Sequence, residues 1–132
     1  MIGNYLPPDW RQSQIGLRGE PNIEPFRQEL RRGCLALAAL AELRDEQYGY
    51  TLRQSLKRRG LSVEQGTLYP LLKRLETQGF LVSDWRQEGG RQKRYYRLST
   101  AGLRLLELLQ REWREIGRTI NAIVDEPQSR AA

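Results

Sequence analysis

The last third of the chain carries an apolar repeat that a small domain cannot bury by itself. Its six members alternate at spacings of three and four: Leu106, Leu109, Trp113, Ile116, Ile120 and Ile123. This alternation places them on one side of an α-helix, at the a and d positions of a heptad repeat. Ser99 or Thr100 can cap the helix. We expect it to run to about Asp125, with Pro127 beyond it. Such a seam requires a partner helix. The simplest partner is the same helix of a second copy, and the alternative is the first helix of the same chain.

A first helix is predicted to begin at about Glu24 or Pro25, because proline suits a first turn. Its apolar residues, at spacings of four, four, three and four, form one stripe: Phe26, Leu30, Cys34, Leu37 and Ala41. Small residues beside the stripe allow close approach of another helix: Ala36, Ala38 and Ala39. The lone cysteine excludes an internal disulfide and is interpreted as a small core residue.

Two shorter helices are predicted next. One opens at residues 48–51 and ends at Gly60, with Leu52 and Leu56 on its inner side. Its last turn carries three positive charges, on Lys57, Arg58 and Arg59. These cations either stabilise the C-terminus of the helix or contact phosphates.

The third helix is predicted to begin near Gly66 or Thr67, which would place Pro70 in its first turn. Ser62 and Gln65 have the spacing of a capping box, and Thr67 is a second candidate cap. Its buried stripe should be Leu68, Leu72 and Leu75, and the helix should stop at residues 78–79.

Residues 81–86 and 93–98 are rich in aromatic and β-branched residues, and Gly89 and Gly90 between them indicate a hairpin. Three helices followed by a basic hairpin is the order of a winged helix-turn-helix. We therefore predict a mainly α fold with a small β-hairpin wing and a long C-terminal dimerisation helix. The expected parts are an extended N-terminal arm (1–25), a winged helix-turn-helix (26–98), a dimerisation helix (99–126) and a tail (127–132).

The proline-rich arm shows no sustained periodicity, and we expect it to lie against a folded surface. The residues that favour this over a disordered tail are apolar: Tyr5, Leu6, Trp10, Ile15 and Leu17.

The excess of positive charge lies in the middle of the chain. Residues 49–97 hold eleven Lys and Arg against four Asp and Glu, a net charge of +7, whereas the remainder carries −1. A basic block of this kind is expected where a protein faces phosphates, and a merely solvated surface is the alternative.

Residues that the chain lacks exclude other functions. With no histidine and one cysteine, it has neither a His-based catalytic centre nor a zinc ligand set. No cofactor or metal is expected, and we predict that the protein is not an enzyme. No apolar run could cross a bilayer and no signal peptide opens the sequence, so no membrane partner and a cytoplasmic location are expected.

The third helix and the wing provide the candidate DNA contacts. By residue type, the helix can offer Gln65, Thr67, Tyr69 and Lys73 to the major groove and Arg74 to phosphates. The wing can offer Arg91, Lys93 and Arg94 to the minor groove or to phosphates. The alternative for each is a solvated surface residue, and Tyr69 has a second one, packing across the helix-turn-helix.

Several segments together resemble the PadR family of transcriptional regulators. They are residues 66–76, 78–81, 48–50, 90–98 and 100–102. The resemblance covers roughly residues 30–125 and is closest to the shorter subfamily, which has a single helix after the wing. The arm before the first helix is not part of the family's common pattern.

The resemblance implies a homodimeric repressor that binds double-stranded DNA. It also implies DNA contacts from Tyr48, Thr67, Tyr69, Lys73 and the basic residues of the wing. Some members sense planar aromatic effectors at the dimer interface, for which Trp113 is the candidate here, with simple packing as the alternative. A symmetric dimer would read half-sites about one helical turn, near 10 bp, apart. A winged-helix module that binds proteins and not DNA is the competing hypothesis.

Overall fold

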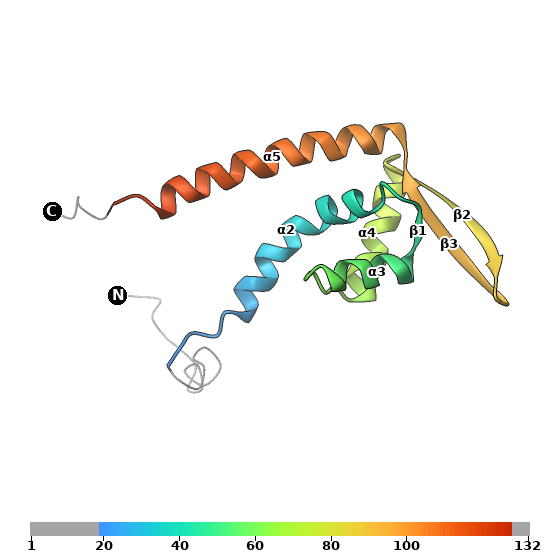
Figure 1. The fold of residues 1–132 in the computed structure, drawn as a ribbon, viewed down its shortest axis with the longest axis horizontal. Coiled ribbons are helices and arrows are strands. Elements are labelled where there is room, and N and C mark those ends of the chain that lie inside the picture. The colour runs from blue at the N-terminus through green and yellow to red at the C-terminus, as the bar shows by residue number, and fades with distance from the viewer. Residues whose placement is uncertain (1–18, 128–132) are drawn as a thin grey trace. The chain divides into compact units, whose positions relative to one another are not determined.

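The computed structural model describes residues 19–127. Most of the predicted arm, with its apolar residues, and most of the predicted tail lie outside the described residues. The elements, in order, are α2 (Glu24–Glu42), β1 (Gln47–Tyr48), α3 (Gly49–Arg58), α4 (Gln65–Thr77), β2 (Leu81–Glu88), β3 (Arg91–Leu98) and α5 (Thr100–Val124) (Figure 1). The chain divides into two units, Met1–Leu35 and Ala36–Ala132. The predicted mainly α fold with a small hairpin wing and a long last helix is confirmed.

Leucine fills the core of the second unit. Its buried apolar residues come from every helix and from the start of the wing: Ala39, Leu40, Leu43, Leu52, Leu56, Leu68, Leu71, Leu72, Leu75, Leu81 and Leu106. The inner sides predicted for α3 and α4 are therefore confirmed, and Leu71 joins the α4 stripe. Each fully buried leucine contributes about 1.5–3 kcal/mol relative to exposure, so this cluster holds the helix-turn-helix together.

The apolar stripe predicted for α2 is not its buried side. In the second unit, the α2 residues that are buried are Ala39 and Leu40, which lie on another side of the helix from the stripe. In the first unit, Phe26 is 61% exposed and Leu30 is 74% exposed. Periodicity located the helix correctly because both sides are apolar, and for the same reason it did not identify the buried side.

Helix α4 begins earlier than predicted. Its N-cap is Glu64, with no hydrogen bond from the cap side chain, so the caps predicted at Ser62 and Thr67 were wrong. Pro70 is consequently the sixth helical residue and not part of the first turn. It has no N–H to donate to the carbonyl of Gly66, four residues earlier. The predicted end is confirmed, because Gln78 is the C-cap and Gly79 follows with φ +89°.

The wing is a tight hairpin. Gly89 and Gly90 have φ values of +56° and +78°, as a two-residue type I′ turn requires. The strands are longer than predicted, since pairing runs from Leu81 with Leu98 to Glu88 with Arg91. The two-residue strand β1 was not predicted; it adds to β3 and gives a three-stranded antiparallel sheet in the order β1-β3-β2.

Hydrogen bonds in the first turn of helix α5 hold the helix against the segment that precedes the wing. Ser99 caps it, since its Oγ accepts from the Gly102 N–H at 2.9 Å and donates to the Gly79 carbonyl at 2.6 Å. The helix then runs to Val124, as predicted. Along the seam, Leu106 is buried, but the residues from Trp113 to Ile123 are at least half exposed.

Candidate nucleic-acid interface

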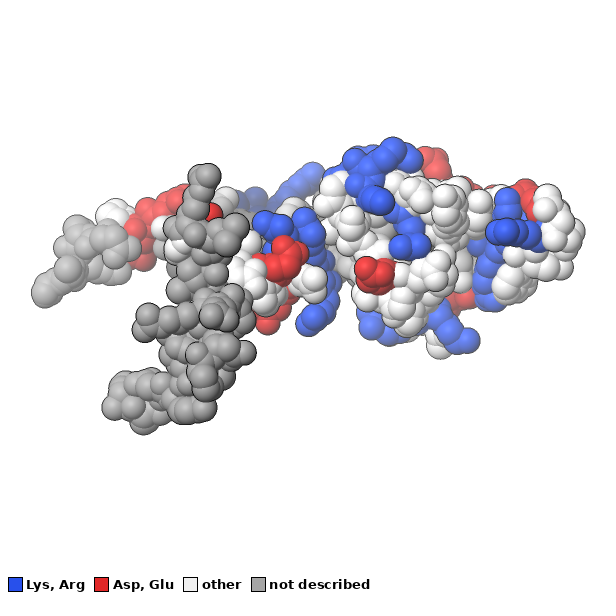
Figure 2. All heavy atoms as spheres, turned by 90° about the horizontal axis from the view of Figure 1, so that it is seen from below, with Lys and Arg blue, Asp and Glu red and all other residues white. Residues whose placement is uncertain are grey.

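Three elements of the second unit border one groove: the start of α3, the start of α4 and the β2–β3 hairpin. The groove has a volume of about 710 Å³ and is lined by aromatic and basic side chains together. Its lining includes Tyr48, Tyr50, Gln65, Tyr69, Trp85, Arg91, Lys93, Arg94 and Tyr96. Figure 2 shows this side of the molecule, with Lys and Arg gathered over the hairpin at the right and around an uncharged central area. Glu88 is the acidic member of this lining, against three basic residues, so the surface suits an anionic partner.

The α4 residues proposed for DNA contact fall on two flanks of the helix. Gln65 and Tyr69, four residues apart, line the groove. Lys73, one turn further along, is exposed and makes no ion pair with any residue that the structure describes. Thr67 and Arg74 are also exposed, but they lie on the flank away from Tyr69 and do not line the groove. A two-residue step turns an α-helix by about 200°, which explains the separation of Thr67 from Tyr69.

Tyr48 belongs to an aromatic cluster at the edge of the sheet. Its ring stacks on Tyr50 with centroids 6.2 Å apart and lies 5.4 Å from the ring of Tyr95. Lys93 Nζ lies 4.7 Å from the centre of the Tyr48 ring, within cation–π range. Tyr48 is half-buried and forms part of the groove wall.

The three basic wing residues differ in how many polar partners their side chains have within the protein. Arg91, at the tip, is exposed, and its side chain makes no hydrogen bond or ion pair with the described part of the chain. Lys93 lies 3.7 Å from Glu88 Oε1. Arg94 is half-buried and held by protein partners: its Nη2 donates to both carboxylate oxygens of Glu76 at 3.0 and 3.1 Å, and its Nε donates to Ser83 Oγ at 2.9 Å.

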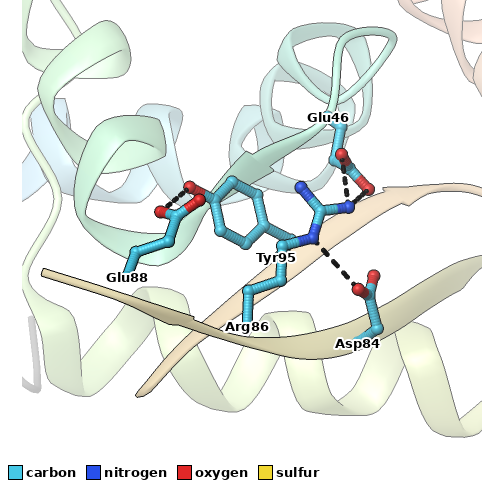
Figure 3. Close-up of polar contacts among 5 residues, drawn as sticks. All are labelled: Glu46, Asp84, Arg86, Glu88 and Tyr95. Atoms are coloured by element: carbon cyan, nitrogen blue, oxygen red, sulfur yellow. Dashed lines mark hydrogen bonds and ion pairs between the residues drawn. The ribbon is translucent and has the colours of Figure 1, made fainter. Parts of the chain in front are cut away.

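A second arginine of the wing is also held by carboxylates, which sequence reasoning missed. Arg86 donates from Nη2 to both oxygens of Glu46 at 2.8 Å and from Nε to Asp84 at 3.1 Å (Figure 3). The hydrogen bond to Glu46 is the largest of the effects that raise the pKa of Arg86 above its ordinary value. This contact ties the hairpin to the segment before β1, forty residues earlier in sequence. No local pattern indicates such a pair.

The ring of Tyr95 completes this arrangement. Arg86 Cζ lies 4.2 Å from its centre, and its hydroxyl donates to Glu88 at 2.6 Å (Figure 3). That hydrogen bond, followed by desolvation, raises the pKa of Tyr95 above its ordinary value. The wing is therefore braced from the middle of β2 to its tip, and the side chain of Arg91 beside the turn stays exposed to meet a partner.

Gly49 provides a test of whether Tyr69 touches DNA or only packs. A Cβ at position 49 would lie 2.8 Å from Tyr69 Cε1, so Gly49→Ala must displace the phenol ring from α3. If the ring contacts DNA, we expect affinity to fall about five- to tenfold, or ~1 kcal/mol. The melting temperature should change little because the ring is partly exposed and can swing. Fluorescence anisotropy with labelled duplex measures the first effect and circular dichroism the second.

Tyr69→Ala is the control for this prediction. In that background Gly49→Ala has nothing to displace, and it should leave DNA affinity unchanged. Equal affinities of Gly49→Ala and the parent protein would show that Tyr69 only packs across the helix-turn-helix.

Two further classes of site are absent from the described residues. Among residues 19–127, no group of three or more acidic, cysteine or histidine side chains is placed to hold a metal ion. Within the same range, no helix is both long and apolar enough to cross a membrane.

Known proteins share this arrangement of helices and wing. The model of the transcriptional regulator PadR-like family matches residues 37–108. A transcriptional regulator of Mycobacterium tuberculosis, Rv3488, is 41% identical over 70% of this chain and 87% of its own length.

Solved structures agree with this match. A PadR family transcriptional regulator from Eggerthella lenta superposes with a TM-score of 0.77 at 37% identity, over 80% of this chain and 94% of its own. A PadR-like transcription factor from Bacteroides fragilis gives a TM-score of 0.63 at 33% identity, over 75% of this chain and 98% of its own. The family match spans more than half of the sequence, and the relatives cover a larger share of it. The chain therefore belongs to the PadR-like family of transcriptional regulators, which are not enzymes.

Proposed function

We propose that the protein is a homodimeric repressor that binds a specific duplex DNA site through α4 and the wing. Family membership implies regulation through DNA binding. The observation that carries the finer proposal is the groove itself, in which the start of α4 and the wing share one basic, aromatic surface. In a winged helix-turn-helix, such a surface inserts the recognition helix into the major groove while the wing follows the backbone.

Phosphate contacts are assigned to basic side chains that have no partner in the described residues. Lys73, Arg74 and Arg91 meet this condition and are exposed. Lys93 shares its charge with Glu88, so its contribution should be smaller. Gln65, Thr67 and Tyr69 are proposed to read base edges, because their side chains offer hydrogen bonds or a methyl group at the helix start.

Dimerisation is proposed through the seam of α5. In this single chain, Trp113 is 51% exposed, Ile116 53%, Ile120 50% and Ile123 62%. A regular a/d row left in water is stabilised when a second identical helix covers it. Two copies related by a two-fold axis would place their recognition helices about one DNA turn, near 10 bp, apart, and a bound dimer would block a promoter.

The same seam supports only a weaker proposal about an effector. A planar aromatic molecule stacked on Trp113 would use the half-exposed indole. Packing of two indoles across the dimer uses the same surface without a ligand, and it is the interpretation we adopt.

Selection of binding sites from random duplex DNA, followed by a salt titration of affinity for the selected duplex, tests the DNA-binding proposal. Each phosphate contact contributes about −0.9 to the slope of log K against log salt. We therefore expect Lys73→Ala and Arg91→Ala each to weaken binding and to make this slope shallower by about one unit. Fluorescence anisotropy between about 50 and 200 mM salt gives the slopes.

Arg111→Ala is the matched control, because Arg111 is an exposed arginine on α5, away from the groove. It should leave both affinity and slope unchanged. Recovery of no preferred duplex, with binding indifferent to Lys73 and Arg91, would instead favour a protein-interaction module.

A further inference from the structure

An exposed tryptophan on the wing has no role in the fold described so far. Trp85 is 59% exposed and lines the groove between the wing and α4. In the hairpin it is paired with Arg94, on the same face as Ser83 and Tyr96. Indole is costly to leave in water, and aromatic side chains are enriched where proteins bind partners. The position of Trp85 therefore indicates that a partner binds in the groove.

The ring of Trp85 is held by a guanidinium group that is itself fixed. Arg94 Cζ lies 5.2 Å from the centre of the Trp85 ring and 5.9 Å from that of Tyr96. The same guanidinium is bound by Glu76 of α4, and Ser83 Oγ donates to the same carboxylate at 2.5 Å. Glu76 thus links the recognition helix to the wing through Arg94. This network restricts the indole before any partner arrives, which reduces the entropy lost on binding.

The basic side chains around the groove indicate the chemical class of this partner. Arg91 and Lys93 border the same groove as Trp85, and Lys73 is exposed on the adjoining helix. A polyanion with apolar surface between its charges complements this mixture of cations and aromatic rings. The sugar-phosphate backbone of duplex DNA has that character: an indole can pack on deoxyribose while its Nε1–H donates to a phosphate oxygen.

We infer that Trp85 packs against the DNA backbone beside the recognition helix, and that Arg94 is a positioning residue for Trp85 and not a phosphate contact. This inference rests on the proposed DNA-binding function and deepens it. It assigns two kinds of DNA contact to the wing. Arg91 supplies a contact that weakens with salt, and Trp85 supplies one that does not depend on salt.

Salt titration separates the two kinds of contact. Trp85→Ala should weaken binding to the selected duplex about tenfold or more, as expected for an aromatic anchor, with the slope unchanged because no charge is lost. Trp85→Phe should restore much of the affinity. The melting temperature should hardly change, since the side chain is mostly exposed. Unaltered affinity of a folded Trp85→Ala protein would overturn the contact.

Replacement of the ion pair tests the positioning role. The joint exchange of Glu76→Gln and Arg94→Gln conserves net charge while removing the fixed guanidinium. We expect it to weaken binding in the parent protein, to leave the salt slope unchanged, and to have little further effect once Trp85 is alanine. A slope that becomes shallower by about 0.9 would mean that Arg94 itself contacts a phosphate, and the positioning role would be wrong.

Fluorescence of Trp85 gives a readout independent of affinity. In a protein carrying Trp10→Phe and Trp113→Phe, Trp85 is the sole tryptophan. Its emission should be quenched or shifted when the selected duplex is added. Duplex binding without any change in emission would overturn the inference while leaving the proposed function intact. Absence of binding by the parent protein would instead overturn the proposed function.

Discussion

Replacement of Ile116 and Ile120 together with glutamate is expected to convert the protein to a monomer and to lower its affinity for the selected duplex at least a hundredfold. Both side chains lie on the exposed half of the α5 seam. In a paired seam, each glutamate would have to lose its hydration without gaining a partner, and two symmetry-related copies double the cost. A monomer binds one half-site only. The avidity gained by linking two half-sites, about 10²–10⁴, would then be lost.

Light scattering after gel filtration measures the mass, and anisotropy measures the affinity. The matched control carries Asn121→Glu and Ala122→Glu, which add the same two charges to the same helix on positions outside the a/d row. It should remain a dimer with nearly the parent affinity. If the glutamate variant stayed dimeric, the α5 seam would not be the dimer interface. A monomeric variant that kept its affinity would separate dimerisation from DNA binding.

Elements with strong local signals were predictable from sequence. The type I′ turn follows from two adjacent glycines, because both of its positions need positive φ. Ser99 caps α5 because its short side chain reaches a backbone N–H three residues ahead. The leucine spacings of α3 and α4 likewise identified their inner sides. In each case the cause lies within a few residues of its effect.

Features that depend on distant residues were not predictable. Strand β1 is only two residues long and exists because β3 offers it a partner edge. The start of α4 at Gln65 moves Pro70 into the helix, which no cap residue indicated.

The basic residues of the candidate site show the same limit. Sequence reasoning gave Arg91 and Arg94 the same role, because type and position were all it could use. In the folded chain the Arg94 side chain binds Glu76, eighteen residues away, whereas the Arg91 side chain makes no hydrogen bond or ion pair with a described residue. Arg86 was counted among the eleven basic residues of the segment 49–97, and it is paired with Glu46 and Asp84. The net charge of the segment thus indicated an anionic partner, but it did not show which cations remain available.

Gly102→Ala is expected to be the most destabilising single-methyl change in the described part of the chain. Gly102 is buried at the start of α5, where a Cβ would collide with the carbonyl oxygen of Phe80. That carbonyl is backbone and also accepts from the N–H of Ser99, so it cannot turn away without losing this hydrogen bond. We expect a loss of about 3 kcal/mol in the free energy of unfolding, the upper end of the usual range for overpacking. For a domain of this size that corresponds to a fall of roughly 12 °C or more in melting temperature.

Gly33→Ala is the matched control, because a Cβ there meets no heavy atom within 4 Å and Gly33 is an exposed residue of a helix. It should raise the free energy of unfolding by about 0.5–1 kcal/mol, since alanine loses less backbone entropy in a helix. Thermal and urea unfolding at one fixed protein concentration compare the two variants, since the stability of a dimer depends on concentration.

The close approach of α5 to Phe80 sets how the long helix leaves the wing. Gly102→Ala should therefore also weaken DNA binding at temperatures where the protein is still folded. Equal melting temperatures for the two alanine variants would mean that the turn between wing and helix yields easily, and that α5 is not held rigidly to the DNA-binding domain.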